Sequence, residues 1–160
     1  MATAGGVKLI EYNARFGDPE ALNLLTLLET DFLEICRAIV DGTLDDLPVS
    51  FQAQASVCKY IVPDGYPENP RKGDVVRAPE GLPGNARVYI GAVDMKDGQM
   101  MATGSRTLGI VGMGETIADA EKACQAVADT IKGPFFHRRD IGTEDLIARR
   151  VAHMNKLRRH

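Results

Sequence analysis

The sequence lacks long apolar runs, since no stretch of it approaches the roughly 18 consecutive apolar residues that a membrane helix requires. Its amino-terminal segment, Met-Ala-Thr-Ala-Gly-Gly, also lacks the charged-then-apolar order of a secretory signal peptide. Internal repeats and low-complexity segments are missing as well. These absences predict a cytoplasmic protein that has no membrane partner.

Cysteine is sparse, with three residues at Cys36, Cys58 and Cys124. Their number is odd, they show no Cys-x-x-Cys spacing, and they have no histidine at metal-ligand spacing. Neither a disulfide framework nor a zinc site is therefore predicted. Cys36 and Cys124 lie on apolar faces of expected helices, where a cysteine is usually a small buried hydrophobe.

An excess of positive charge is also lacking. The chain has 19 Lys and Arg residues and 22 Asp and Glu residues, so its net charge is -3. This balance argues against a nucleic-acid partner, since phosphate backbones are bound by clustered cations. Basic residues gather only after Asp145, at Arg149, Arg150, Lys156, Arg158 and Arg159. The favoured interpretation is a final helix whose cations complement its dipole, and the alternative is a phosphate-binding tail.

What remains is typical of a globular protein: 160 residues, 44% of them hydrophobic and 26% charged. This length and composition allow a substantial hydrophobic core. The composition argues against a disordered chain.

The front of the chain predicts one strand and two helices. Residues 7–15 alternate in their second half and predict a strand, and Asp18 then predicts an N-cap with Pro19 at the first helical position. The leucines of residues 22–28 lie nearly all round that helix, which indicates burial on several sides by structure outside the chain. Either Thr30 or Asp31 is predicted to cap a second helix, which ends at residues 41–42.

The residue pattern changes at residues 47–51, from helical periodicity to short strands separated by turns. We predict a boundary between two structural units there. Strands are predicted at residues 53–61 and 107–111, and residues 86–93 and 99–103 predict a hairpin around a loop at 94–98. Thr116 and Asp119 form a variant of the capping box, which predicts a helix that ends before Gly133-Pro134.

Three polar side chains alternate along the first predicted strand. Glu11, Asn13 and Arg15 would point the same way at intervals of roughly 6–7 Å. Oxygen ligands such as those of Glu and Asn suit Mg²⁺, and an arginine can bind phosphate through two hydrogen bonds. The pattern therefore predicts a polyphosphate site, although any exposed strand face can carry polar residues with this period.

The longer string at residues 11–20, Glu-Tyr-Asn-Ala-Arg-Phe-Gly-Asp-Pro-Glu, resembles the motif near the end of the ATP-grasp domain of phosphoribosylamine-glycine ligases. Residues 56–67, 104–116 and 137–142 resemble the carboxyl-terminal domain of the same family, in the same order. The resemblance covers nearly the whole chain.

The resemblance implies an α+β fold in two parts. Residues 1–48 would be the end of the ATP-grasp domain, a remnant of its sheet with two helices. Residues 49–160 would be a mainly antiparallel β domain, similar to a barrel-sandwich hybrid, with one packed helix.

The resemblance also implies roles for individual residues. Glu11 and Asn13 would ligate Mg²⁺ or Mn²⁺ that bridges the ATP phosphates, and Arg15 would be the catalytic residue that stabilises the transferred phosphate. Substrate-binding residues would be Arg15, Asp18, Pro19 and Glu20. Arg138 and Arg139 either contact the phosphoribosyl substrate or form a structural ion-pair cluster, and His137 is expected to be a packing or hydrogen-bonding residue.

The reaction implied is the ATP-dependent joining of glycine to 5-phosphoribosylamine, which gives glycinamide ribonucleotide, ADP and phosphate in purine biosynthesis. Its partners would be these small molecules and an amino-terminal part or subunit that supplies the adenine pocket. Three explanations stay open: a fragment, one subunit of a split enzyme, or a truncated relative. A non-catalytic interaction module is the alternative function, and assembly as a homo-oligomer stays open.

Overall fold

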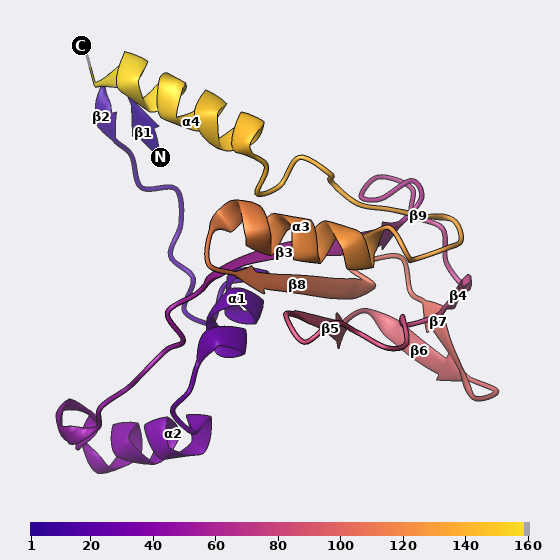
Figure 1. Ribbon diagram of the computed structural model, residues 1–160, viewed down its shortest axis with the longest axis horizontal. Coiled ribbons are helices and arrows are strands. Elements are labelled where there is room, and N and C mark those ends of the chain that lie inside the picture. Colours follow the sequence, from indigo (N-terminus) through magenta and orange to yellow (C-terminus); the bar gives the residue numbers. More distant parts are fainter. Residues whose placement is uncertain (159–160) are drawn as a thin grey trace.

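The computed structural model describes residues 1–158 and has the predicted α+β composition (Figure 1). Within these residues it contains four α-helices, one short 3-10 helix and three small antiparallel sheets. None of the described helices is both long and apolar enough to cross a membrane. Arg159 and His160, which the sequence places in the basic tail, lie outside the described residues.

The central sheet has the strand order β5 (Ala86–Ile90), β8 (Leu108–Gly114), β3 (Ala55–Pro63) and β9 (Phe135–Phe136). Strands β3 and β8 form its longest ladder, from Ala55 opposite Gly114 to Ile61 opposite Leu108. Both strands are almost entirely buried, which confirms the strands predicted at residues 53–61 and 107–111. The main core lies between this ladder and helix α3 (Ile117–Ala128).

Helices cover both faces of the β3–β8 ladder, α3 on one face and α1 (Glu20–Leu27) on the other (Figure 1). Two glycines of β8 allow the close approach. A Cβ atom at Gly112 would lie 2.2 Å from the carbonyl oxygen of Ala120 in α3, and one at Gly109 would lie 2.6 Å from Leu22 Cδ1 in α1. Because alternate strand residues face opposite sides, each glycine serves one helix.

Helix α3 begins as the sequence predicts. The side chain of Thr116 accepts a hydrogen bond from the backbone N–H of Asp119 and donates one to the Asp119 carboxylate. Ala120, Cys124 and Val127 are buried against the sheet, whereas Ile117, also expected on the apolar stripe, is 48% exposed.

The predicted hairpin forms and its second strand lies where it was expected, but its first strand and its turn are different. Its strands are β6 (Val93–Lys96) and β7 (Gln99–Ala102), beside β4 (Val75–Val76), and the connecting turn is Asp97-Gly98 rather than a loop over residues 94–98. Both turn residues have positive φ, 51° and 75°, the geometry of tight two-residue hairpins. Residues 86–90 instead pair with β8 as β5.

One charged side chain is completely buried in this unit. Lys59 of β3 is 0% exposed, and its ammonium group donates to Glu121 Oε1 at 2.5 Å, Gln125 Oε1 at 2.7 Å and the backbone oxygen of Arg139 at 3.0 Å. All three N–H donors of the ammonium group have an acceptor. Lys59 thus joins the central strand to helix α3 and to the segment that follows β9.

The strand predicted at residues 7–15 does not form. The backbone is extended in a short hairpin of β1 (Ala2–Thr3) and β2 (Gly6–Val7), and residues 8–17 belong to no strand. A strand requires a hydrogen-bonded neighbour, and no other strand among residues 1–158 pairs with this segment. The expected remnant of an ATP-grasp sheet is therefore wrong for the described chain.

The two front helices are present and largely uncovered. Asp31 caps α2 (Phe32–Asp41) by accepting from the N–H of Leu33, and Gly42 ends it at φ 69°, as predicted. A short 3-10 helix, η1 (Leu44–Asp46), follows. The prediction that α1 needs further covering structure agrees with its exposure, since Leu24 is 50% and Leu25 42% exposed.

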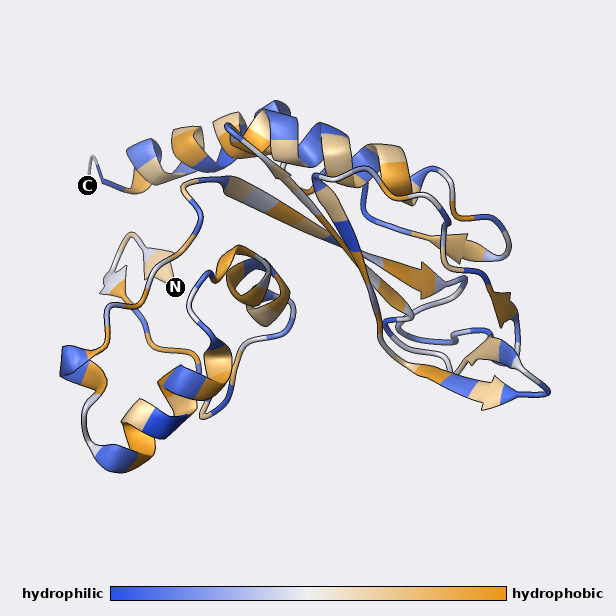
Figure 2. Ribbon diagram, turned by 60° about the horizontal axis from the view of Figure 1, so that its bottom comes forward, coloured by the Kyte–Doolittle hydropathy of each residue, from blue (hydrophilic) through white to orange (hydrophobic). Residues whose placement is uncertain are grey.

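Apolar exposure is concentrated in this part of the chain. Figure 2 shows hydrophobic residues along α2, which lies apart from the central sheet. The exposed fractions of Leu33, Ile39 and Val40 are 64%, 59% and 85%. The return to β3 is held to α1 by a hydrogen bond from the N–H of Gln52 to the carbonyl of Leu27, and the division into residues 1–48 and 49–160 stays a prediction.

The basic carboxyl-terminal segment forms helix α4 (Glu144–Leu157), which confirms the favoured interpretation of the tail as a final helix. The Thr143 side chain caps it, with Glu144 and Asp145 in its first turn and Lys156 in its last, as the helix dipole favours. None of its residues is buried, and it lies beside the β1–β2 hairpin (Figure 1).

The close approach of α3 to β8 generates a first prediction. Gly112→Ala places a methyl group against backbone atoms of α3, which cannot give way as a flexible side chain can, so we expect the free energy of unfolding to fall by roughly 3 kcal/mol. Gly84→Ala is the matched control, because a Cβ atom there meets nothing within 4 Å. Urea unfolding followed by circular dichroism measures both variants, and equal stabilities would contradict this account of the packing.

The buried ammonium group generates a second prediction. Lys59→Met leaves Glu121 without its cation and frees the carbonyl of Arg139, so we expect a loss of about 3 kcal/mol in the free energy of unfolding. The double variant Lys59→Met/Glu121→Leu removes both charges and should recover part of that loss. A single variant as stable as the wild type would show that the ion pair contributes little.

Candidate functional site

Asp18 connects the front segment to the central sheet. The hydroxyl group of Tyr60 donates to Asp18 Oδ1 at 2.5 Å, and Arg106 Nη1 donates to Asp18 Oδ2 at 2.9 Å. The Arg106 guanidinium carbon also lies 5.5 Å from the centroid of the Tyr60 ring, a cation–π contact. Burial and the bond to Asp18 raise the pKa of Tyr60, so the phenol stays protonated and acts as the donor.

The prediction of Asp18 as an N-cap is therefore wrong. Helix α1 begins at Glu20, Pro19 occupies the cap position, and no side chain caps the helix. The physical reason is competition, because both carboxylate oxygens of Asp18 already accept from Tyr60 and Arg106 across the sheet.

The predicted metal and phosphate residues share one open cleft of about 580 Å³. Glu11, Asn13 and Arg15 line it together with Asp18, Glu20 and Arg106. The Arg15 guanidinium group donates to the backbone oxygen of Phe16 at 2.7 Å. The structure thus brings five of the predicted site residues around one space, although the strand expected to align them is absent.

The donors of this cleft fit a divalent cation in kind. Glu11 offers carboxylate oxygens and Asn13 an amide oxygen, and both side chains are exposed. Mg²⁺ commonly takes one or two protein oxygens and completes its shell with water and substrate phosphates. Among residues 1–158, no group of three or more His, Cys, Asp or Glu side chains could hold a metal ion by itself.

A second cleft, of about 430 Å³, shares Arg106 with the first. Pro19 and Arg138 line it, with a wall of mainly aromatic, aliphatic and proline side chains: Tyr60, Val62, Tyr66, Pro67, Phe136 and Ile141. The Arg138 guanidinium group is bound to the Asp140 carboxylate at 2.8 and 3.1 Å, which lowers the pKa of Asp140. Arg106 lines both clefts and connects them.

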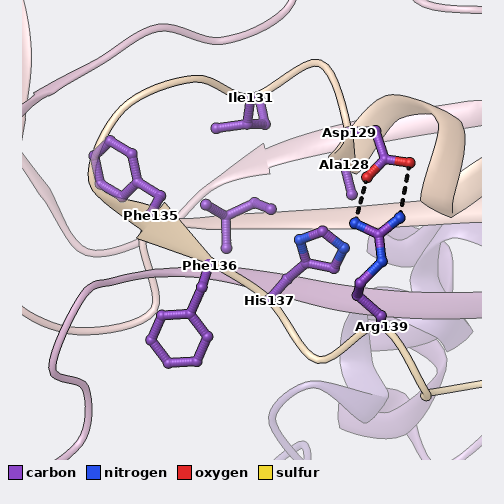
Figure 3. A pocket seen from close by; sticks show the side chains of 8 residues that line it. Ala128, Asp129, Ile131, Phe135, Phe136, His137 and Arg139 are labelled. Carbon is purple, nitrogen blue, oxygen red and sulfur yellow. Dashed lines mark hydrogen bonds and ion pairs between the residues drawn. The ribbon is translucent and has the colours of Figure 1, made fainter.

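Arg139 faces a different cleft, of about 340 Å³, shown in Figure 3. Its guanidinium group forms two hydrogen bonds with Asp129, at 2.8 and 3.2 Å, beside the ring of His137. The sequence treated Arg138 and Arg139 alike. The structure separates them, placing Arg138 with Pro19 and Arg106, and Arg139 in an ion pair at the end of α3.

His137 has the hydrogen-bonding role that the sequence predicted. Its Nε2 lies 3.0 Å from Gln125 Nε2 and 3.3 Å from Gln125 Oε1, so the ring shares a hydrogen bond with the Gln125 amide group. Burial lowers the pKa of His137, and the neighbouring charges of Arg139 and Lys59 lower it further. Gln125 also binds Lys59, so His137 joins the network that fixes this segment.

Arg106 and Tyr66 are residues of the two clefts to which sequence reasoning gave no role. Both stand within stretches that carry the family resemblance, residues 104–116 and 56–67. Arg106 lies 88 positions from Asp18, so no local pattern could have joined them. An alignment of many relatives is the signal that could have found them.

Comparison with known proteins agrees with these observations. Residues 56–144 match the family model "Phosphoribosylglycinamide synthetase, C domain". The phosphoribosylamine-glycine ligase of Methanosarcina barkeri is 51% identical over 99% of this chain, and that of Methanocaldococcus jannaschii is 47% identical over 99%. The crystal structure of the Thermotoga maritima phosphoribosylamine-glycine ligase matches 88% of the chain with a TM-score of 0.66 and 28% identity.

These matches cover most of this chain but only about a third of each relative. The chain spans 36% of the length of each of these two curated relatives and 34% of the Thermotoga maritima chain. By its family model, its relatives and its fold, this chain belongs to the phosphoribosylamine-glycine ligase family and corresponds to the carboxyl-terminal part of those enzymes.

Proposed function

We propose that the chain serves as the carboxyl-terminal part of an ATP-dependent ligase that joins glycine to 5-phosphoribosylamine in purine biosynthesis. The observation that carries this proposal is 51% identity to such a ligase over 99% of the chain. A second observation supports the proposal: Glu11, Asn13 and Arg15, whose side chains suit a cation and phosphate, line one cleft.

The residues of this cleft would act on the ATP phosphates. Glu11 and Asn13 would hold Mg²⁺ or Mn²⁺ through their oxygens, and Arg15 would bind the phosphate that is transferred. When bound, the cation neutralises negative charge on the ATP phosphates. Arg15 has one hydrogen bond, to its neighbouring carbonyl, so its guanidinium group keeps further donors for phosphate.

The reaction would proceed by phosphorylation of the glycine carboxylate. The amine of phosphoribosylamine then attacks the acyl carbon of glycyl phosphate, the C–N bond forms, and phosphate leaves. Positioning and electrostatic stabilisation suffice for this chemistry, so it requires no nucleophilic side chain. Pro19 and Arg138 line the adjacent cleft, and Asp18 and Glu20 the phosphate-side cleft, so each would bind or position substrate.

The remainder of the ligase would supply the adenine pocket and cover the front helices. The exposed apolar side chains of residues 7–51 support this, because a sizeable exposed apolar surface marks an interface. The partner would be an amino-terminal part or a separate subunit, and the chain alone would be inactive. A cytoplasmic location stays a prediction.

Reconstitution tests the proposed function. The purified chain should form no glycinamide ribonucleotide from glycine, phosphoribosylamine and MgATP, whereas adding the amino-terminal part of a homologous ligase should restore turnover. Glu11→Ala should reduce that turnover at least about 100-fold, since the cation that would neutralise the ATP phosphates loses a carboxylate ligand. The matched control is Asp94→Ala, an exposed carboxylate on β6 outside both clefts. Full activity of Glu11→Ala would remove the proposed metal site.

The exposed face of α2 favours a second candidate, a non-catalytic interaction module. Leu33, Ile39 and Val40 are more than half exposed on one short helix. In this alternative the unit from residue 49 is the stable fold, and residues 1–48 dock on a partner.

Light scattering during gel filtration tests this candidate. The chain alone should associate as its concentration rises, and Val40→Lys should reduce that association because it buries a charge in the interface. Met95→Lys, at a 67% exposed position on β6, is the control and should change nothing. A monomer at every concentration would count against docking through α2.

A further inference from the structure

Strand β6 has a free edge. The small sheet has the strand order β4-β7-β6, so β6 pairs with β7 on one side and with no further strand of residues 1–158 on the other. Asp94, Met95 and Lys96 are all exposed, and the exposed fraction of Met95 is 67%. Such an edge presents backbone N–H and C=O groups to which another strand can add.

The hydrogen bonds of the sheet show which residues face that edge. The N–H of Thr103 donates to the carbonyl oxygen of Ala92 at 3.3 Å, so the carbonyl of Ala92 faces β7. Backbone groups alternate in direction along an antiparallel strand, so those of Asp94 and Lys96 also face β7. The backbone N–H and C=O of Met95 therefore point outward, toward the free edge.

The edge is complementary to a second copy of itself. In an antiparallel pair of two β6 strands centred on Met95, the two Met95 residues lie opposite each other and exchange two backbone hydrogen bonds. Asp94 of each copy then lies opposite Lys96 of the other, which gives two contacts of opposite charge. Among residues 1–158, neither side chain belongs to an ion pair that would compete.

The charge pattern also selects the register. A lysine on an edge strand commonly prevents pairing with other chains, because it is costly to desolvate. Opposite Asp94 of a second copy, the same lysine is compensated. A shift of the pairing by one residue would remove both compensating contacts, so the charges favour the arrangement centred on Met95.

The other face of the paired strands is apolar. Met95 lies opposite Met100 of β7, and Met100 lies opposite Val76 of β4, so the three side chains form a row across the sheet. Val76 is 3% exposed and belongs to the core, whereas Met95 at the end of the row is uncovered. A second copy would continue the row through its own Met95 and cover both of these methionines.

The position of β6 leaves the rest of the molecule accessible. The β6–β7 hairpin lies at the end of the molecule away from α2 and from both termini (Figure 1). None of its residues lines either cleft of the candidate site. A second copy bound at β6 would therefore obstruct neither the front helices nor the two clefts.

We propose that two copies of this chain associate through β6, antiparallel and centred on Met95, so that their two three-stranded sheets join into one. The contact is isologous and therefore closes at two copies. Because β6 has only four residues, the interface is smaller than that of a permanent dimer, and we expect a dissociation constant of about 100 µM. This dimer does not depend on the proposed ligase function.

The first test is sedimentation equilibrium of the full chain, at concentrations from tenfold below to tenfold above the expected dissociation constant. We expect a reversible equilibrium between monomer and dimer. A monomer throughout this range would overturn the proposal.

Charge reversal tests the register. Asp94→Lys places two lysines opposite each other at both charge contacts, and Lys96→Asp places two aspartates there, so each variant alone should dimerise at least about tenfold more weakly. An equimolar mixture of the two variants should dimerise like the wild type, because every lysine then lies opposite an aspartate. Restoration in the mixture would also show that both variants are folded.

Asp45→Lys is the matched control for these reversals. Asp45 is exposed on η1, in the front part of the chain and away from the hairpin, so its reversal should leave dimerisation unchanged. An equal loss in Asp45→Lys would show that net charge alone governs association. That result, or a mixture of Asp94→Lys and Lys96→Asp that stays monomeric, would overturn pairing through β6.

A final comparison separates this dimer from association through α2. Met95→Lys should weaken the β6 dimer and Val40→Lys should not, which is the reverse of the result expected for docking through α2. Association that is sensitive only to Val40→Lys would overturn the proposal. Ligase turnover does not enter these measurements, so the dimer and the proposed function can fail separately.

Discussion

The ammonium group of Lys59 is the interaction on which the arrangement of the larger unit depends. A fully buried charge is tolerated only when its donors are satisfied, and here the acceptors come from α3 and from the backbone at Arg139. The central strand, the covering helix and the segment after β9 must therefore lie in one arrangement for the charge to be stable. That arrangement directs Arg138 and Arg139 to different clefts.

The candidate site depends on a second long-range contact, between Asp18 and the pair Tyr60 and Arg106. Residues 8–17 form no strand in the described chain, so their position relative to the sheet is fixed mainly by α1 and this carboxylate. The cleft of the proposed metal residues and the second cleft therefore share one arginine, Arg106. A change at Arg106 should affect both.

Local patterns predicted the elements whose signals are contained in a few neighbouring residues. Asp31 and Gly42 bound α2, Thr116 caps α3, and the buried strand before it forms as expected. The predictions that failed concerned partners far away in the sequence. The strand predicted at residues 7–15 has no neighbouring strand among the described residues and does not form. Asp18, predicted as an N-cap, instead accepts hydrogen bonds from Tyr60 and Arg106.

The sequence by itself determined the family, because the string at residues 11–20 and the ordered stretches after it are chemically specific, and it determined the helices whose caps and apolar stripes are local. Only the tertiary structure decided which arginines face a cleft and which carboxylate Arg106 binds. The physical reason is distance along the chain. Capping and periodicity act within about four residues, whereas ion pairs such as that of Asp18 and Arg106 form only after folding brings distant residues together.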